Sequence, residues 1–268
     1  MKVAILGCGP AGLFAAHAAN RAGAEYTIYS RKVRSNIAGA QFLHVPIPGI
    51  EEEADQVTIV RWGTPAVYAD KATGKLQELG LDTSWTRWET HERATIWSLA
   101  RAYDNAWRGY ENDIQNQEVD FKFVDWCVSE YDLVVSTVPL DAIIDPALLP
   151  ALGLLKQIVY IVPAPRVRGN VLVFNGSHNE GQWYRYSCLF GHSTYEFSDR
   201  ADAEEMAHHL ETKVITARKP YAIVSPKFEN MHPNVLKVGR HGRWHKLGLT
   251  HEAFYMTYSE ILKGTLDT

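Results

Sequence analysis

A glycine-rich turn joins a short apolar run to an alanine-rich segment at the start of the chain. The run is Lys2 to Leu6, the turn is Gly7-Cys8-Gly9-Pro10-Ala11-Gly12, and the alanine-rich segment is Leu13 to Ala22. In Gly-x-Gly-x-x-Gly, the first glycine permits a tight turn and the second lets backbone amides approach a pyrophosphate. The third allows the helix to pack closely on the strand. The succession predicts strand, turn and helix, with phosphates at the helix N-terminus.

The end of the second strand decides how a dinucleotide's ribose is held. That strand is predicted at Tyr26 to Tyr29, and an acidic residue is expected where it ends. The sequence has Ser30 there, followed by Arg31 and Lys32. Two cations beside a small hydroxyl suit a 2′-phosphate, so NADP is a physical alternative to FAD or NAD. Solvated surface charges explain Arg31 and Lys32 equally well.

Hydrophobic patterns predict the remaining helices and strands. Apolar residues recur at three- and four-residue steps over Glu89 to Gln115, which predicts an amphipathic helix. The nearly continuous apolar run Asp132 to Val138 is typical of a parallel strand buried on both faces. Further strands are predicted at Val57–Val60, Ile158–Val162, Asn170–Phe174, Trp183–Phe190, Val214–Thr216 and Asn234–Val238, and further helices at Asp199–Thr212 and His251–Lys263.

Helices alternate with strands at both ends of the chain, and the middle has strand character with little helix. This order predicts the α/β class, with a Rossmann-type FAD/NAD(P)-binding domain built on a parallel sheet and interrupted by a strand-rich substrate-side domain. We expect residues 1–60, 89–145 and 225–268 to form the discontinuous dinucleotide-binding domain. Residues 61–88 and 146–224 are expected to form the strand-rich cap.

Composition excludes several classes of partner. The 268 residues include 27 Lys and Arg against 31 Asp and Glu, so the net charge of -4 gives no broad attraction to nucleic acid or to an anionic membrane. No apolar stretch approaches the ~18 residues of a membrane span. The three cysteines fit neither a disulfide framework nor a zinc site, and no metal site is expected. The sequence favours a cytoplasmic protein with a small-molecule partner, and its aromatic residues are compatible with a homodimer.

Later segments follow, in the same order, the motifs of one flavoenzyme family. The string Gly7 to Leu13 is similar to the opening of FAD-dependent enzymes in general. The other similarities are to the family's Gly-Ala-His-x-x-His, Gln-Trp-Gly, Pro-Tyr-Thr-Arg, Pro-Tyr-Tyr-Pro and Gly-Arg motifs, and they lie at Gly39-Ala40-Gln41-Phe42-Leu43-His44, Arg61-Trp62-Gly63, Gln182-Trp183-Tyr184-Arg185-Tyr186, Pro220-Tyr221 and Gly239-Arg240. On these motifs the chain resembles the UDP-galactopyranose mutases.

The resemblance implies a flavin reaction without net redox change. Reduced flavin attacks the anomeric carbon of a UDP-sugar and expels UDP, so that the sugar recloses as a furanose. The implied catalytic residues are Arg185 at the substrate pyrophosphate, Trp62 in the pocket wall, Tyr221 at the diphosphate and His44 beside the flavin. With the N-terminal turn included, the cofactor contacts are expected at Gly7, Gly9, Pro10, Ala11, Gly12, Ser30, Arg31, Gly39, Gln41, Gly239 and Arg240.

Departures from the family keep other functions open. Gln41 stands where the family has its first histidine, and only about 17 residues separate His44 from Trp62, where the family has a long helical domain. One alternative is an FAD- or NADP-dependent oxidoreductase acting on a small amine or alcohol. Another is a non-catalytic nucleotide-binding sensor, because a fold does not fix a function.

Overall fold

Two β-sheets organise the protein. The computed structural model describes residues 1–39, 41–74, 92–223, 232–245 and 248–266. The first sheet is wholly parallel, in the order β12-β6-β1-β2-β5. Its strands are β12 (Val235–Lys237), β6 (Leu133–Ser136), β1 (Lys2–Leu6), β2 (Glu25–Ser30) and β5 (Ile114–Asn116). The sheet confirms the predicted α/β class.

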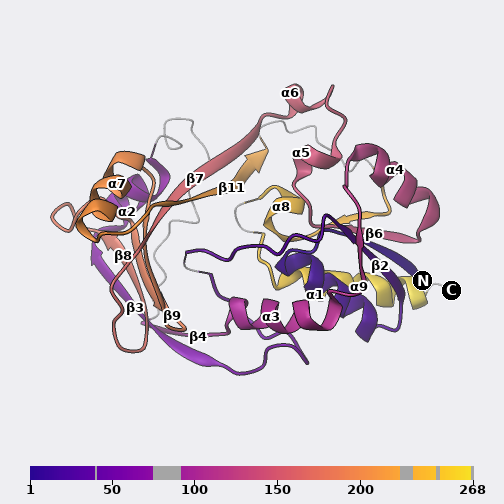
Figure 1. Cartoon of the computed structure of the whole chain (residues 1–268), viewed down its shortest axis with the longest axis horizontal. Coiled ribbons are helices and arrows are strands. Elements are labelled where there is room, and N and C mark those ends of the chain that lie inside the picture. Colours follow the sequence, from indigo (N-terminus) through magenta and orange to yellow (C-terminus); the bar gives the residue numbers. More distant parts are fainter. Residues whose placement is uncertain (40, 75–91, 224–231, 246–247, 267–268) are drawn as a thin grey trace.

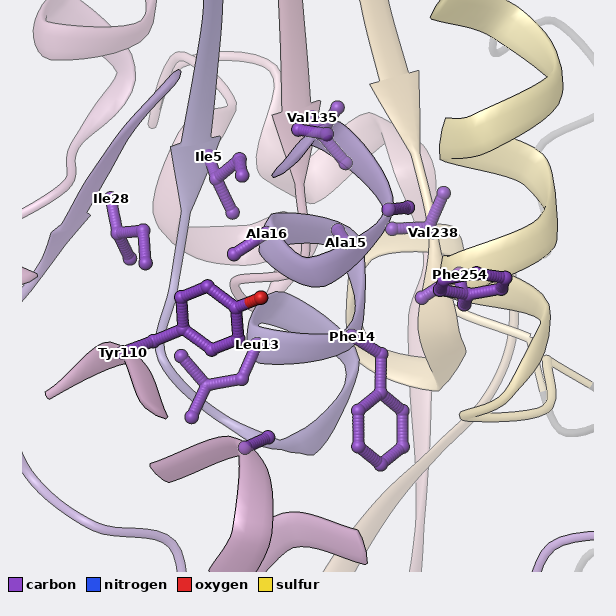
Figure 2. Close-up of a cluster of buried hydrophobic side chains, with 14 of the residues drawn as sticks. Ile5, Leu13, Phe14, Ala15, Ala16, Ile28, Tyr110, Val135, Val238 and Phe254 are labelled. Atoms are coloured by element: carbon purple, nitrogen blue, oxygen red, sulfur yellow. The ribbon is translucent and has the colours of Figure 1, made fainter. Parts of the chain in front are cut away.

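Helix α1 (Pro10–Arg21) connects β1 to β2 and is deeply buried. Its residues Leu13 to Ala16, Ala18 and Ala19 have no exposed surface. Helices α3 (Leu99–Tyr110) and α9 (Glu252–Leu266) pack against it. Figure 2 shows Leu13 and Phe14 of α1 in one apolar cluster with side chains from the sheet and from α9. The small alanines allow these elements to approach closely, which explains the alanine-rich segment.

The opposite face of the parallel sheet carries a second core. Val3 and Ile5 of β1 belong to the α1 side, whereas Ala4 and Leu6 pack on the other side with Trp244. A strand buried on both faces reads as a continuous apolar run, as predicted for Asp132 to Val138. The elements on this second side are α4 (Phe121–Glu130), α5 (Leu140–Ile143), α6 (Leu149–Leu152) and α8 (Gly239–Arg243).

The second sheet is mixed and has seven strands in the order β11-β7-β10-β9-β8-β3-β4. They are β11 (Ile215–Ile223), β7 (Leu154–Pro163), β10 (His192–Phe197), β9 (Arg185–Leu189), β8 (Asn170–Gly176), β3 (Asp55–Gly63) and β4 (Arg93–Ile96). Helices α2 (Pro65–Thr73) and α7 (Arg200–His209) accompany it. In Figure 1 this sheet occupies the left half of the view and the parallel sheet the right half.

The predicted helix over residues 89–115 is wrong at both ends, and residues 89–91 of it lie outside the described residues. The Ser98 hydroxyl accepts a hydrogen bond from the amide of Arg101 (3.2 Å), so α3 begins at Leu99. The residues before it form β4 and pair antiparallel with β3, and Ile114 joins β5 of the other sheet. Apolar residues of two strands therefore continued the helical spacing by chance.

The middle of the chain also contains more helix than expected. Thr64 caps α2, with Pro65 as its first residue, and Asp120 caps α4. These are ordinary helix start signals. Sheet membership departs from the expected domain boundaries, because β3 begins at Asp55 and β4 lies within 89–145, yet both strands belong to the mixed sheet. Residues 40, 75–91, 224–231, 246–247 and 267–268 of those ranges lie outside the described residues. No described helix has the length and apolar character needed to cross a membrane.

Candidate functional site

The turn between β1 and α1 has no room for side chains at two of its glycines. Gly7 has a φ of +104°, and a methyl group there would lie 2.5 Å from the Thr137 hydroxyl oxygen. A methyl group at Gly12 would overlap the carbonyl oxygen of Gly7. The first and third glycines therefore fix the packing of strand against helix, as their positions in the motif predict.

The second glycine has a different environment. A methyl group at Gly9 would meet only the Ser35 hydroxyl oxygen, at 3.3 Å. Helix α1 starts directly after Gly9 with Pro10, and its first turn has no side-chain cap and no acidic residue. Amides at an uncapped helix start, together with the helix dipole, favour an anion. Gly9 thus lies at the uncapped start of α1, and its predicted contact with a pyrophosphate stays a prediction.

The Gly239-Arg240 motif meets this turn, although it is far away in sequence. Gly239 has a φ of +68°, and a methyl group there would lie 2.8 Å from the Cβ atom of Ala11. The carbonyl of Ser136 at the end of β6 accepts a hydrogen bond from the amide of Val238 (3.0 Å) and so anchors the start of α8. The structure therefore brings together two of the segments expected to contact a dinucleotide.

Ser30 and Arg31 lie at the predicted strand end. The Ser30 carbonyl accepts a hydrogen bond from the Gln117 amide at 3.0 Å. Arg31 forms an ion pair with Glu118 at 3.6 Å, and both side chains are 74% exposed. An ion pair of this kind contributes little to stability. The proposed contacts of Ser30 and Arg31 with a ribose or a 2′-phosphate stay predictions.

The segment that follows β2 is fastened beside the turn. The Tyr103 hydroxyl donates to the carbonyl of Cys8 (3.0 Å) and accepts from the amide of Ser35 (3.0 Å). Arg34 pairs with Asp104 and lies over the rings of Tyr103 and Trp107. Helix α3 therefore positions this segment beside the glycine turn.

A row of residues crosses the mixed sheet on the face turned away from α7. The strand register aligns Arg61, Phe174, Arg185 and Glu196 on neighbouring strands. The next row, which includes Tyr186, faces α7 in an apolar cluster. Arg185 consequently lies on the opposite face from Tyr186, as strand alternation predicts.

Arg185 is bound to a buried carboxylate. Its Nε donates to Oε2 of Glu196 at 3.0 Å, its Nη2 donates to the same oxygen, and the Tyr184 hydroxyl donates there at 2.9 Å. The side chain of Glu196 is 0% exposed and that of Arg185 is 22% exposed. Burial and the nearby Glu196 carboxylate raise the pKa of Tyr184, which keeps its hydroxyl protonated as a donor.

Two further cations surround this carboxylate. Lys219 of β11 places Nζ 4.0 Å from Oε1 of Glu196, and its side chain is 12% exposed. Burial lowers the pKa of Lys219 to about 8. Burial and the neighbouring Arg185 also lower the pKa of Arg240. The buried Nε of Arg240 has no hydrogen-bond partner among the described residues.

Gly39 links the loop after β2 to this cluster. Its φ is +80°, and a methyl group there would lie 2.5 Å from Oε1 of Glu196. The Gln41 side chain donates to the carbonyl of Ala38 at 2.6 Å, so it stabilises its own turn. Ala40 of the same motif lies outside the described residues. Gly39 is therefore required by the approach of the loop to the buried carboxylate.

The other predicted site residues do not gather around Arg185. Trp62 is 39% exposed and lies against Trp183, with ring centroids 5.6 Å apart, on the α7 side of the sheet. His44 is exposed, and its ring lies 5.8 Å from that of His251. Tyr221 is buried at an irregularity of β11, two residues beyond Lys219. The predicted catalytic roles of Trp62, His44 and Tyr221 remain predictions.

Glu196, Lys219 and Tyr184 were absent from the expected site. Pairing of β9 with β10 places Glu196 opposite Arg185, and pairing of β11 with β7 places Lys219 on the same face. A Tyr-Arg-Tyr strand followed by a turn and a second strand could have indicated an acidic partner for Arg185. The approach of Lys219 to Glu196 depends on the order of the strands across the sheet, and the sequence contains no signal for that order.

Comparisons with known proteins identify the fold. No family model and no curated protein matches the sequence. Klebsiella pneumoniae HpxO complexed with FAD and uric acid matches with a TM-score of 0.50 and 12% identity, over 98% of this chain and 79% of that one. Two other matches are a proposed FAD-containing monooxygenase from Photorhabdus luminescens (TM-score 0.45, 11% identity, 99% and 89% coverage) and 2-methyl-3-hydroxypyridine-5-carboxylic acid oxygenase (TM-score 0.47, 13% identity, 98% and 87% coverage). The chain shares the HpxO fold, with a parallel sheet and a second, strand-rich sheet.

Proposed function

We propose that this protein is an FAD-dependent oxidoreductase acting on a small molecule. The observation that carries the proposal is the glycine turn, which meets Gly239 of α8 and leaves the first turn of α1 uncapped. The mixed sheet then supplies the wall of charged side chains on which a substrate would lie. An HpxO structure containing both FAD and uric acid supports this combination for the same fold.

The residues around the turn fit FAD. Gly9, Ala11 and Gly12 border the amides that would hold its pyrophosphate, and Pro10 removes a donor that a helix start does not need. Ser30 and Arg31 would meet the adenosine ribose, and Gly239 with Arg240 would meet the opposite end of the cofactor. When bound, FAD supplies hydride and electron transfer, which no side chain of this chain provides. NADPH is the proposed reductant of the flavin.

The environment of Arg185 favours this function over the mutase that the sequence resemblance implies. A mutase would use this guanidinium to neutralise the pyrophosphate of a nucleotide sugar. In the structure Nε and Nη2 of the guanidinium already bond to the buried carboxylate of Glu196, so part of its charge is neutralised and only its remaining N–H groups could meet a diphosphate. A small-molecule oxidoreductase does not depend on this guanidinium as a diphosphate ligand.

The test compares two Gly→Val variants with the wild-type protein. Gly9→Val places a branched side chain between the turn's amides and the pyrophosphate, so we expect a folded but colourless protein. Gly109→Val is the control, because a side chain at Gly109 meets nothing within 4 Å. The measurements are the visible spectrum, the mass of the released cofactor, and far-UV circular dichroism.

Wild-type protein that neither contains FAD nor takes it up would overturn the proposal. If the Gly9→Val protein had full flavin occupancy, the glycine turn would not be the part of the chain that binds the pyrophosphate. The second measurement is NADPH consumption in the presence of UDP-galactopyranose and of small heterocyclic acids. Ring contraction of the UDP-sugar without net consumption of NADPH would replace the oxidoreductase with the mutase.

A further inference from the structure

The cluster around Glu196 contains more positive than negative charge. Arg185, Lys219 and Arg240 are three cations, and Glu196 is the carboxylate they share among the described residues. The side chain of Glu196 is wholly buried and that of Lys219 is largely buried. The Nε atom of Arg240 is buried as well. Buried charges are ordinarily paired, because removal from water costs several kcal/mol per ion. The described part of the cluster therefore lacks a negative charge.

The hydrogen bonds of the cluster show which of its cations could bind a further anion. Oε2 of Glu196 accepts hydrogen bonds from Arg185 and from the Tyr184 hydroxyl. Lys219 is 4.0 Å from the other oxygen, which is longer than a good charge-assisted hydrogen bond. Arg240 has a buried Nε donor without a partner in the described chain. Lys219 and Arg240 thus keep donor capacity that Glu196 does not fill.

The position of the cluster connects it to the proposed reaction. Lys219 lies on the sheet face that carries Arg185, and Arg240 directly follows Gly239, which touches the dinucleotide turn at Ala11. Gly39 closes over Glu196 from the loop after β2. Residues of the mixed sheet, of α8 and of the loop after β2 therefore meet here, beside the proposed cofactor site.

We propose that Lys219 and Arg240 bind an anionic group, a carboxylate or a delocalised oxyanion, of the small-molecule substrate. This inference rests on the proposed function, since it assigns the substrate class of the same site. Glu196 holds Arg185 in place and prevents the three cations from repelling one another. A neutral amine or alcohol would leave the two donors without a counter-charge, so the site selects organic acids.

The experiment measures binding of benzoate, acetate and benzamide by isothermal titration calorimetry. Benzamide has nearly the shape of benzoate but no charge. The titrations use protein as purified and protein saturated with FAD. Lys219→Met and Arg240→Met remove one positive charge each and keep an unbranched apolar stem. Arg218→Met is the matched control, because Arg218 is exposed on the same strand and alternates to the opposite face.

We expect benzoate to bind at least about tenfold more tightly than benzamide, and each of the two site variants to lose about tenfold or more in benzoate affinity. Arg218→Met should bind benzoate like the wild type. Equal affinity for benzoate and benzamide would overturn the proposal, as would failure of both benzoate and acetate to bind. Binding that disappears on saturation with FAD would also overturn it, because the cofactor would then supply the counter-charge.

The same titrations separate the two proposals. Protein that contains no FAD in any preparation yet binds benzoate through Lys219 contradicts the oxidoreductase and retains the anion subsite. Yellow protein that ignores benzoate and acetate contradicts the subsite and leaves the oxidoreductase standing.

Discussion

The two sheets reach the candidate site by different means. The parallel sheet contributes backbone, because its glycines at positions 7, 9 and 12 make room for a close approach and the surrounding core is almost wholly apolar. The mixed sheet contributes charged side chains on one face while its other face packs on α7 through apolar residues. Backbone amides can bind a dinucleotide with little contribution from side chains. Selection of a substrate, in contrast, depends on the chemistry of the side chains.

This difference also predicts where substitutions act most strongly. In the parallel half the damage comes from added atoms, and in the mixed half it comes from removed charge. A variant can therefore change the packing around a glycine of the parallel half, or the charge on the mixed sheet, without changing the other.

The largest loss of stability is expected from Glu196→Gln. The variant keeps the shape of the side chain but leaves three buried or half-buried cations without their carboxylate. We expect the free energy of unfolding to fall by about 3–5 kcal/mol, measured by urea denaturation. Glu204→Gln is the control, because its ion pair with Arg200 is exposed and should contribute little to stability. Similar losses for the two variants would contradict the described charge cluster.

A somewhat smaller loss is expected from Gly12→Ala. The added methyl group overlaps the carbonyl oxygen of Gly7, so strand and helix must separate slightly. Overpacking of this kind typically costs about 1–3 kcal/mol, and we expect the upper end because both neighbours are backbone. The measurement is again urea denaturation, in the absence of added nucleotide. A variant as stable as the wild type would show that the turn tolerates a wider spacing.

The contrast between the sheets explains what could be predicted from the sequence. The fold class followed from the glycine turn, since Gly7 and Gly12 serve a local geometry that the sequence spells out in one string. Strand alternation places Arg185 on the opposite face from Tyr186, and its predicted role at a pyrophosphate stays a prediction, whereas its carboxylate partner depends on strand pairing between β9 and β10. The helix over 89–115 was mistaken because Ile96 and Ile114 belong to strands of two different sheets. The spacing of apolar residues alone does not distinguish a longer helix from a helix flanked by two strands.

The pH dependence of stability reports the charge on Lys219. Burial holds its pKa at about 8, below the ordinary 10.5, and Glu196, Arg185 and Arg240 are the charged groups that face it. Between these two values the unfolded chain binds more protons than the native protein, so stability rises with pH. From pH 7 to pH 9 this group should add about 1.3 kcal/mol to the free energy of unfolding.

The measurement is the difference in unfolding free energy between the wild type and Lys219→Met at pH 7, 8 and 9. Taking the difference removes contributions from the other titrating groups. Lys263→Met, at an exposed position of α9, is the control for removal of a surface ammonium. A slope of the opposite sign for Lys219→Met would mean that the ammonium is stabilised where it lies.

The smallest effect, and the only expected gain, is at Gly109 near the end of α3. A side chain there meets nothing within 4 Å, and its φ lies outside the left-handed region. Gly109→Ala removes conformational freedom from the unfolded chain without adding a contact, so we expect about 0.5 kcal/mol of stabilisation by urea denaturation. Gly12 and Gly109 both occur in helices of the parallel half, yet the same substitution should change stability in opposite directions. A loss at both positions would mean that alanine is tolerated poorly throughout this half, and the loss at Gly12 would then not show a special requirement of the turn for close backbone approach.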